Sequence, residues 1–399
     1  MPEEIANKKS KYDIIELHKF YFEGYKMNKK KIALPAAIGV AAVWFGSHAG
    51  GGFATGRQEV EFFVQFGWHS IWVGMLSMLI MGIAIYNGLE FARIHNIHDY
   101  KNLFKQLYAP YNKMLPTLWD VLYLYATLLG SGVAIAGASD LVYQSLRIPY
   151  GIAVIIIGLI LLIFTVFGAG LVRSASTAMS VFIIGALLIV TILGIKMGAA
   201  NLGEVVTGKA SRAGFGKILW MALLYGSFQS VLIAPIVSVS EALKTRKNSF
   251  LAALFGGLIN GAMLILVCIM LLSFYPAVIK ENLPVYFVTN QLGHQWLFVL
   301  YSLILFFALI STGVGLIFGA VKRFEIVWTR DNAIFKGLRS KRIAISLVCL
   351  LISAGISLFG LTAIVALGYS SLGYAAVFLN IIPLLVIAPV KIRKARKKE

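Results

Sequence analysis

The sequence predicts an all-α polytopic membrane protein, with ten transmembrane helices arranged as two five-helix repeats of opposite orientation. Three observations support this fold class. Apolar residues make up 59% of the 399 positions, and charged residues only 13%. Runs of about 20 apolar residues, enough to cross a hydrocarbon layer about 30 Å thick, recur along the whole chain. Two of these runs are interrupted near their middle by glycine and serine residues.

The expected spans follow these apolar runs, and the first and the sixth are the interrupted ones. They cover residues 32–66, 68–94, 115–146, 149–167, 173–199, 214–243, 248–274, 295–328, 342–360 and 362–390. The first apolar run is too long for a cleavable signal peptide, and the residues before it are charged. Residues 1–31 are therefore expected to be a basic cytoplasmic segment, and residues 391–399 a basic cytoplasmic tail.

The distribution of basic residues predicts the orientation of the spans. With the N-terminus inside, 29 of the 36 Lys and Arg residues lie on the cytoplasmic side, as the positive-inside rule requires. The net charge of +19 thus indicates contact with the anionic inner leaflet rather than with nucleic acid, and both termini are cytoplasmic. Residues 12–25 form an apolar-aromatic stripe with acidic and basic residues opposite it, which fits either a short helix on the inner membrane surface or a disordered tail.

An internal repeat is visible at an offset of 181 residues. TLLGSGVAIAG at 127–137 aligns with ALISTGVGLIF at 308–318, and at nearly this offset the two interrupted spans align with each other. The amphipathic loop segment 98–108 likewise finds a counterpart at 281–293. Because each repeat holds an odd number of spans, the second copy is inverted. The two repeats are assigned to residues 32–200 and 201–390.

The first interruption, WFGSHAGGGFATGRQE at 44–59, is the most informative segment. A glycine triplet costs about 1 kcal/mol per residue in a helix and frees backbone groups that lipid cannot satisfy. The half-helix that begins near Phe53 would offer the N–H groups of residues 51–54 to a carboxylate, and carbonyls near Gly46 and Ala49 would suit a cation. This arrangement is typical of a secondary transporter. The alternative is a packing notch between helices.

His48 is an ionisable residue at membrane depth, where such residues usually face a cavity or a partner. It could relay a proton, hydrogen-bond a substrate, or cap a freed backbone group as a neutral imidazole. At the second interruption, Tyr225 and Phe228 could wall a substrate or stack on an amine, and Gln229 adds a polar contact. The candidate substrate-binding residues are Ser47, His48, Gly50, Gly51, Gly52, Phe53, Ser131, Tyr225, Gly226, Ser227, Phe228 and Gln229.

Two interrupted helices in inverted five-helix repeats resemble the LeuT fold of the amino acid–polyamine–organocation superfamily. The G-GFATGRQE…FF pattern, from Gly51 to Phe63, resembles the YkvI-type group of bacterial membrane proteins within it. In sodium-coupled members of the fold, carbonyls at the first break share a Na⁺ with a Ser/Thr pair on helix 8. The resemblance therefore implies a Na⁺ site at Gly46, Ala49, Ala308, Ser311 and Thr312. The alternative is that both hydroxyls bond within their own helix.

Other chemistry is not favoured by the sequence. The motifs HExxH and GxSxG are absent, so no enzyme is expected. Spans 4, 5, 7 and 9 hold no carboxylate at mid-depth for a divalent metal, and no cofactor is expected beyond Na⁺ as a coupling ion. Cys268 and Cys349 lie in separate spans and are expected to be core residues. Arg57 with Glu61, and Asp140, are candidates for an outer gate or for simple surface pairs.

The sequence thus predicts a secondary active transporter in the cytoplasmic membrane of a bacterium. It would move a small organic solute, an amino acid or a related zwitterion or amine, by alternating access coupled to Na⁺ or H⁺. The alternative is a membrane sensor or scaffold that has a transporter fold and does not transport. The substrate, the coupling ion, the direction of transport and the oligomeric state are left open by the sequence.

Overall fold

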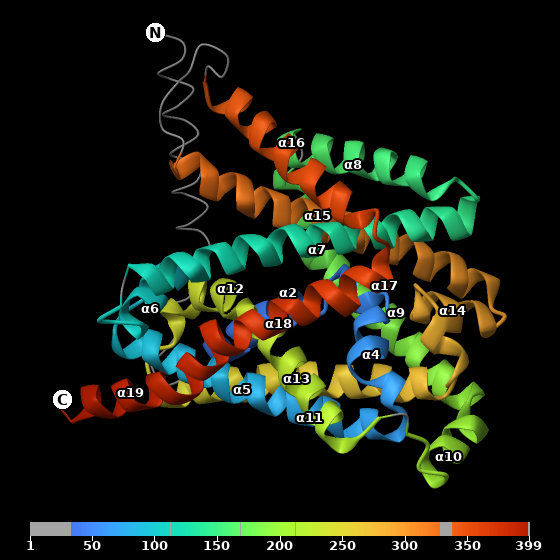
Figure 1. Cartoon of the computed structure of the whole chain (residues 1–399), viewed down its shortest axis with the longest axis horizontal. Coiled ribbons are helices and arrows are strands. Elements are labelled where there is room, and N and C mark those ends of the chain that lie inside the picture. Colours follow the sequence, from blue (N-terminus) through green and yellow to red (C-terminus); the bar gives the residue numbers. More distant parts are fainter. Residues whose placement is uncertain (1–32, 112, 168, 212, 328–336, 398–399) are drawn as a thin grey trace.

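The computed structural model describes residues 33–111, 113–167, 169–211, 213–327 and 337–397 (Figure 1). The N-terminal segment 1–31, with the surface helix considered at 12–25, lies outside these residues. Within the described part, regular structure is helical throughout.

The helices follow the expected spans closely. In chain order they are α2 (Ala33–His48), α3 (Gly51–Ala54), α4 (Arg57–Phe62), η1 (Val64–His69), α5 (Ser70–Ile94), α6 (Tyr100–Leu107), α7 (Met114–Leu146), α8 (Tyr150–Phe167), α9 (Ala169–Met197), α10 (Ala199–Thr207), α11 (Phe215–Gln229), η2 (Ser230–Leu232), α12 (Ile233–Ser238), η3 (Ser240–Ala242), α13 (Arg246–Leu272), η4 (Ala277–Lys280), α14 (Pro284–Gln291), α15 (Gln295–Val327) and α16 (Gly337–Ser357). The last helical stretch runs from α17 (Leu361–Ala363) through the π-helical turn η5 (Ile364–Tyr369) and α18 (Ser370–Ala376) to α19 (Ala388–Arg396).

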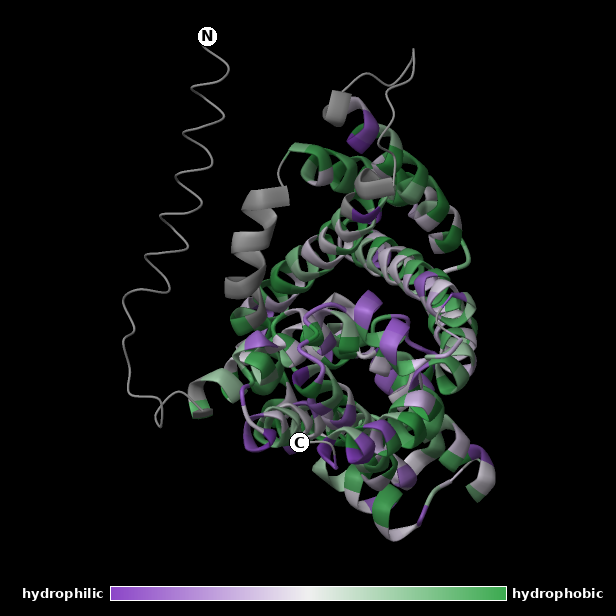
Figure 2. Cartoon of the chain, turned by 90° about the vertical axis from the view of Figure 1, so that its left-hand side faces the viewer, coloured by the Kyte–Doolittle hydropathy of each residue, from purple (hydrophilic) through white to green (hydrophobic). Residues whose placement is uncertain are grey.

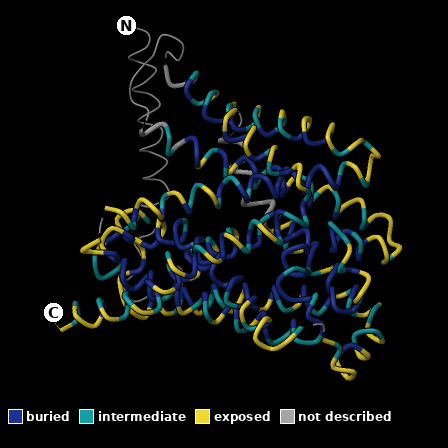
Figure 3. The backbone as a smooth tube through the Cα atoms, viewed as in Figure 1, coloured by how far each residue is buried: buried dark blue, intermediate teal, exposed yellow. Residues whose placement is uncertain are grey.

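The protein is a multi-pass membrane protein. Eight helices of the described chain are long and apolar enough to cross a bilayer, and a ninth span forms if the pair 181–197 and α10, bent by 72°, counts as one. The shorter apolar helix α2 precedes the first interruption. The total of ten spans and the inverted repeat therefore stay predictions. Hydrophobic residues cover most of the outer helices, and buried residues concentrate along the inner faces (Figures 2 and 3).

The first interruption has the predicted position. Helix α2 ends at His48, Gly50 is extended at φ −73° and ψ −175°, and α3 begins at Gly51. A second bend follows at Gly56, which has φ +79° and separates α3 from α4. A Cβ on Gly56 would also come within 2.7 Å of the Val285 side chain, so this bend requires glycine. The part of the first span that follows the break is consequently two short helices.

The second interruption differs from the prediction of a broken helix. Helix α11 passes through the 3₁₀ turn η2 into α12, and Ser230 and Leu232 keep right-handed helical dihedrals. The prediction of two separate half-helices is wrong here because this segment holds one glycine, Gly226, instead of a triplet. The hydroxyl of Ser227 donates to the Leu223 carbonyl at 2.6 Å, so the polar side chain is satisfied without unwinding the helix.

The helices pack as two groups around the first interruption. Helix α13 packs on α2 and on α5, and α11 packs on α5 and on α18. Helices α7, α8, α15 and α16 form the second group, shown in the upper part of Figure 1. Helix α3 lies against α15 and α7, which places the interruption where the two groups meet.

The two amphipathic loop segments form short helices, as predicted. They are α6 and α14. Asp99 caps α6 by accepting a hydrogen bond from the Asn102 N–H at 2.8 Å, and Pro284 starts α14.

Candidate functional site

A cavity of about 400 Å³ lies at the first interruption, between the end of α2, α3, α7, α11, α12, α15 and the last helical stretch. It brings together many of the residues predicted from the sequence. Seven of the candidate substrate-binding residues line it: Ser47, His48, Gly50, Gly52, Phe53, Phe228 and Gln229. All five candidate ion-binding residues line it as well: Gly46, Ala49, Ala308, Ser311 and Thr312.

Gly51 does not line the cavity, contrary to its predicted place beside the substrate. A Cβ at this position would lie 2.8 Å from Leu309 Cα and 3.0 Å from the Ala308 carbonyl carbon. Its N–H donates to Thr312 Oγ1 at 3.0 Å. The glycine thus lets α3 lie directly against the backbone of α15, which the sequence pattern could not show.

Four further candidates lie behind the cavity wall. Ser131 is buried in α7 and donates to the Thr127 carbonyl at 2.8 Å. Gly226 packs on α5, where a Cβ would meet the Ser77 carbonyl oxygen at 3.0 Å. Ser227 bonds within its own helix. Tyr225 is fully buried and meets the lining residues through His48 and through the ring of Phe228, whose centroid is 5.1 Å away.

The interruption exposes backbone groups to the cavity, though fewer than predicted. The Ala54 N–H donates to the Gly50 carbonyl at 3.0 Å, so it is not free. In the described part of the chain, the N–H groups of Gly52 and Phe53 make no hydrogen bond, and the carbonyls of Gly46 and Ala49 accept none from the backbone. Donors and acceptors therefore remain on opposite sides of the break, where a zwitterion or an anion and a cation can use them.

His48 is buried beside the cavity, with 4% of its surface exposed. Its Nε2 lies 3.0 Å from the hydroxyl of Tyr225, and its ring centroid is 5.2 Å from that of Phe53. The amide of Asn260, on α13, lies near the same imidazole. The ring is thus held from two sides while it still forms part of the cavity wall.

The cavity has an aromatic and amide wall that the sequence reasoning only partly found. Phe228 stacks on Tyr369 with the ring centroids 4.8 Å apart and an interplanar angle of 13°. Gln229 Nε2 donates to Gln58 Oε1 at 3.2 Å, and both glutamines line the cavity. Gln58, Tyr369, Tyr123 and Thr127 are lining residues that were missed. The polar pair Gln58-Glu59, so soon after the glycine triplet, was the available signal.

The residues considered for an outer gate meet the segment after α13. Arg57 pairs with Glu61 at 3.0 Å and also donates to the carbonyls of Ile279 and Glu281, both at 3.0 Å. Asp140 accepts a hydrogen bond from Asn282 at 3.4 Å. Arg57 and Asp140 therefore reach the same segment, 279–282, without pairing with each other.

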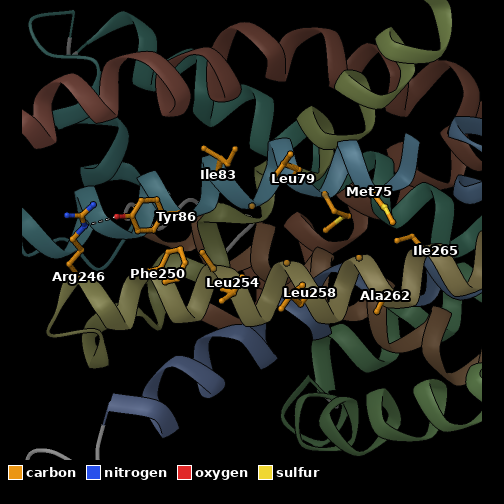
Figure 4. Close-up of a pocket in the computed structure, with 15 residues that line it drawn as sticks. Met75, Leu79, Ile83, Tyr86, Arg246, Phe250, Leu254, Leu258, Ala262 and Ile265 are labelled. Atoms are coloured by element: carbon orange, nitrogen blue, oxygen red, sulfur yellow. Dashed lines mark hydrogen bonds between the residues drawn. The ribbon is translucent and has the colours of Figure 1, made fainter. Parts of the chain in front are cut away.

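A second cavity, of about 690 Å³, lies between α5 and α13 and is apolar along most of its length (Figure 4). At one end Arg246 donates to the Tyr86 hydroxyl at 3.1 Å. Its wall includes Leu79 and Leu258, which are more than half exposed, so it opens on the outer surface of the protein. Although larger, it lacks the broken backbone of the first cavity, and its polar side chains are confined to the end formed by Arg246 and Tyr86.

The first cavity brings carbonyl and hydroxyl oxygens together. Among the described residues, no group of three or more His, Cys, Asp or Glu could hold a metal ion. The cavity offers two freed carbonyls and the hydroxyls of Ser311 and Thr312. Thr312 accepts one hydrogen bond, and a hydroxyl oxygen has a second lone pair for a cation.

Comparison with known proteins identifies the fold. No family model matches the chain. The chain is 25% identical over 295 residues, 73% of its length and 81% of the relative, to the uncharacterized membrane protein YkvI of Bacillus subtilis strain 168. It superposes on a variant of the Eremococcus coleocola manganese transporter with a TM-score of 0.57 at 13% identity, over 89% of this chain and 79% of that chain.

Two further structures of transporters give the same result. MhsT in complex with L-phenylalanine matches with a TM-score of 0.56 at 13% identity, over 90% of this chain and 97% of that chain. The inward-facing conformation of Mhp1 matches with a TM-score of 0.56 at 13% identity, over 86% of this chain and 75% of that chain. These neighbours are LeuT-fold transporters, so the LeuT fold implied by the sequence resemblance is confirmed.

Proposed function

We propose that the protein is a secondary active transporter that moves a small organic solute by alternating access. The observation that carries this proposal is the cavity at the first interruption, which brings together freed backbone donors and acceptors, His48 and an aromatic wall. A static membrane scaffold gains nothing from a helix broken inside the bilayer, because the freed groups cost free energy unless a ligand uses them. The fold of the neighbouring structures supports the same function.

The chemistry of the cavity favours an amino acid or a related zwitterion. The N–H groups of Gly52 and Phe53 suit a carboxylate at the start of a helix segment, and the stacked Phe228 and Tyr369 suit an amine or an apolar side chain. The described residues that line the cavity include no Asp or Glu, so the site differs from one built for a divalent cation. MhsT, with the same fold, is known in complex with L-phenylalanine.

Transport would be driven by Na⁺ or H⁺. Gly46, Ala49, Ala308, Ser311 and Thr312 line one cavity, so carbonyl and hydroxyl oxygens are available for Na⁺. His48 lines the same space and could instead carry a proton. The positive-inside distribution of Lys and Arg supports a bacterial cytoplasmic membrane location with both termini in the cytoplasm and an anionic inner leaflet around the basic loops.

A ligand screen on purified protein tests this function. We expect an amino acid or a related amine to raise the melting temperature, and a radiolabelled form of that ligand to enter proteoliposomes by counterflow. Phe228→Ala should abolish the shift, because it removes one ring of the aromatic wall. Leu258→Ala, in the second cavity, is the matched control and should keep it. A ligand that binds without counterflow would favour the alternative, a sensor built on a transporter fold.

A further inference from the structure

Glu59 is a buried acid that has no role in the cavity described above. It lies on α4 and has 0% of its surface exposed. Neither of its carboxyl oxygens has a hydrogen-bond partner among the described residues. Glu61, two positions later on the same helix, pairs with Arg57 and is partly exposed. The two acids of α4 therefore differ both in exposure to solvent and in pairing with a cation.

The nearest cation is occupied elsewhere. Arg57 donates from one terminal nitrogen to the carbonyls of Ile279 and Glu281, and from the other to Glu61. Residues two apart in a helix point to different sides, so Glu59 does not share the face on which Arg57 meets Glu61. Arg57 thus pairs with Glu61 and acts on Glu59 only as a nearby charge, and Glu59 makes no ion pair within the described chain.

The ionisable groups that face Glu59 from neighbouring elements are all neutral at physiological pH. Its charge would act on Tyr225 of α11, Cys268 of α13, Tyr301 of α15 and Tyr369 of η5. Each of these side chains is buried. The other charged residues of the elements packed on α4 include Lys280 of η4, which is exposed, and His69 of η1, which is partly exposed. None of these contacts supplies a positive charge.

An unpaired carboxylate in such surroundings costs several kcal/mol, whereas the neutral acid does not carry this penalty. Metal binding is not a substitute, because the neighbours are aromatic hydroxyls and a thiol rather than a set of carboxylates and carbonyls. In this conformation the side chain is therefore a carboxylic acid. Tyr225 connects this region to the transport cavity, since its hydroxyl lies 3.0 Å from His48.

We propose that Glu59 binds and releases one proton in each transport cycle. The proposal rests on the transport function above and adds a proton to that cycle, whether or not Na⁺ also binds. The acid is protonated while α4 is packed as in this structure. When α4 moves and water reaches the carboxyl, the O–H bond breaks and the proton passes to water on that side. The reverse transfer from water on the other side restores the acid, and no electrons are exchanged.

The protonation itself can be tested without knowing the solute. Infrared spectra of the purified protein in lipid nanodiscs at neutral pH should contain a carboxylic-acid carbonyl band that Glu59→Gln removes and Glu59→Asp shifts. Glutamine has nearly the shape of the neutral acid, so this variant should fold. Glu204→Gln, at an exposed carboxyl of α10, is the control and should leave the band unchanged. A band that persists in full in Glu59→Gln would overturn the proposal.

The coupling is tested with proteoliposomes and a mixture of radiolabelled amino acids. Glu59→Gln should keep exchange at equal pH but lose accumulation driven by a pH gradient. A gradient of one unit corresponds to a free energy of about 1.4 kcal/mol, or a concentration ratio of about tenfold. Accumulation in Glu59→Gln equal to that of the wild type would overturn the role of Glu59 and leave the transport function standing. Absence of exchange by the wild type would overturn the proposed transport of amino acids instead.

Discussion

The imidazole of His48 and the hydroxyl of Tyr225 lie 3.0 Å apart, although 177 residues separate them in the chain. The contact joins the end of α2 to α11 and is backed by the rings of Phe62 and Phe63, which both pack on Tyr225. The ring of Tyr225 is thus held by apolar contacts, and its hydroxyl is directed at His48 in the cavity wall.

Tyr225→Phe isolates this hydrogen bond. The ring contacts remain, but His48 loses a buried partner, so we expect a loss of about 1–3 kcal/mol in stability. The melting temperature of the purified protein measures it. Tyr143→Phe, at an exposed position of α7, is the matched control and should be neutral. Equal melting temperatures for Tyr225→Phe and the wild type would mean that the hydrogen bond contributes nothing.

Gly51→Ala tests the close approach of α3 to α15. Its methyl group would lie 2.8 Å from Leu309 Cα, and backbone atoms cannot move aside as a flexible side chain can. We expect a destabilisation of about 1–3 kcal/mol, the usual cost of overpacking. Gly39→Ala in α2, where a Cβ meets nothing within 4 Å, should be neutral or stabilising. The approach would be refuted by a Gly51→Ala protein as stable as Gly39→Ala.

Gly52→Val should remove substrate binding and leave the protein folded. Its Cβ would come 2.8 Å from Gln58 Nε2, a side chain that can move, at the cost of the Gln58–Gln229 hydrogen bond. The valine then fills part of the cavity. Gly82→Val on α5, where a Cβ has open space, should bind normally. Both variants are compared in the ligand-induced shift of melting temperature; an unchanged shift in Gly52→Val would make the first interruption a packing notch.

Variants at Ser311 and Thr312 test the proposed Na⁺ site. If Na⁺ stabilises the wild type, the double variant Ser311→Ala with Thr312→Ala should abolish that stabilisation, because both hydroxyl ligands are gone. Thr312→Ser should retain it, since the hydroxyl that accepts the Gly51 N–H is kept. The measurement is the melting temperature with Na⁺ against the same concentration of choline. A sodium response that survives in the double variant would remove this site.

Cysteine labelling tests the orientation. Thiols introduced at Lys280 and Glu204 should react with an impermeant reagent from outside, and thiols at Lys247 and Lys394 only from inside. All four positions are exposed, and the two native cysteines are buried and should not react with the reagent. Labelling of position 247 from outside the cell would contradict the predicted topology.

The first interruption could be predicted because its cause is local. Three consecutive glycines disfavour a helix wherever they stand, so the break and the residues beside it followed from the sequence. The second interruption could not, because a single glycine leaves the outcome to packing, and Gly226 packs tightly on α5 within a continuous helix. A local sequence pattern predicts where a helix is disfavoured, whereas tertiary contacts decide whether the helix is interrupted there.

Glu59 and Gln58 were missed for a related reason. In the sequence they belong to a charged group, GRQE, that resembles the polar end of a span. Gly56 turns the chain with a left-handed residue, and α4 then packs inward on α13 and η5, so that Gln58 lines the cavity and Glu59 is buried. Burial at this point follows from the turn at Gly56 together with tertiary packing, which composition and periodicity do not reveal.

The hydrogen bond from Gly51 to Thr312 also has a consequence for biogenesis. It joins residues 261 positions apart, and the cavity wall extends to Leu372. During synthesis, the interrupted first span therefore enters the bilayer long before the helices that cover its backbone exist. We expect the nascent chain to remain bound to the insertion machinery until α15 has been synthesised. Chains truncated before residue 312 should be degraded by quality control.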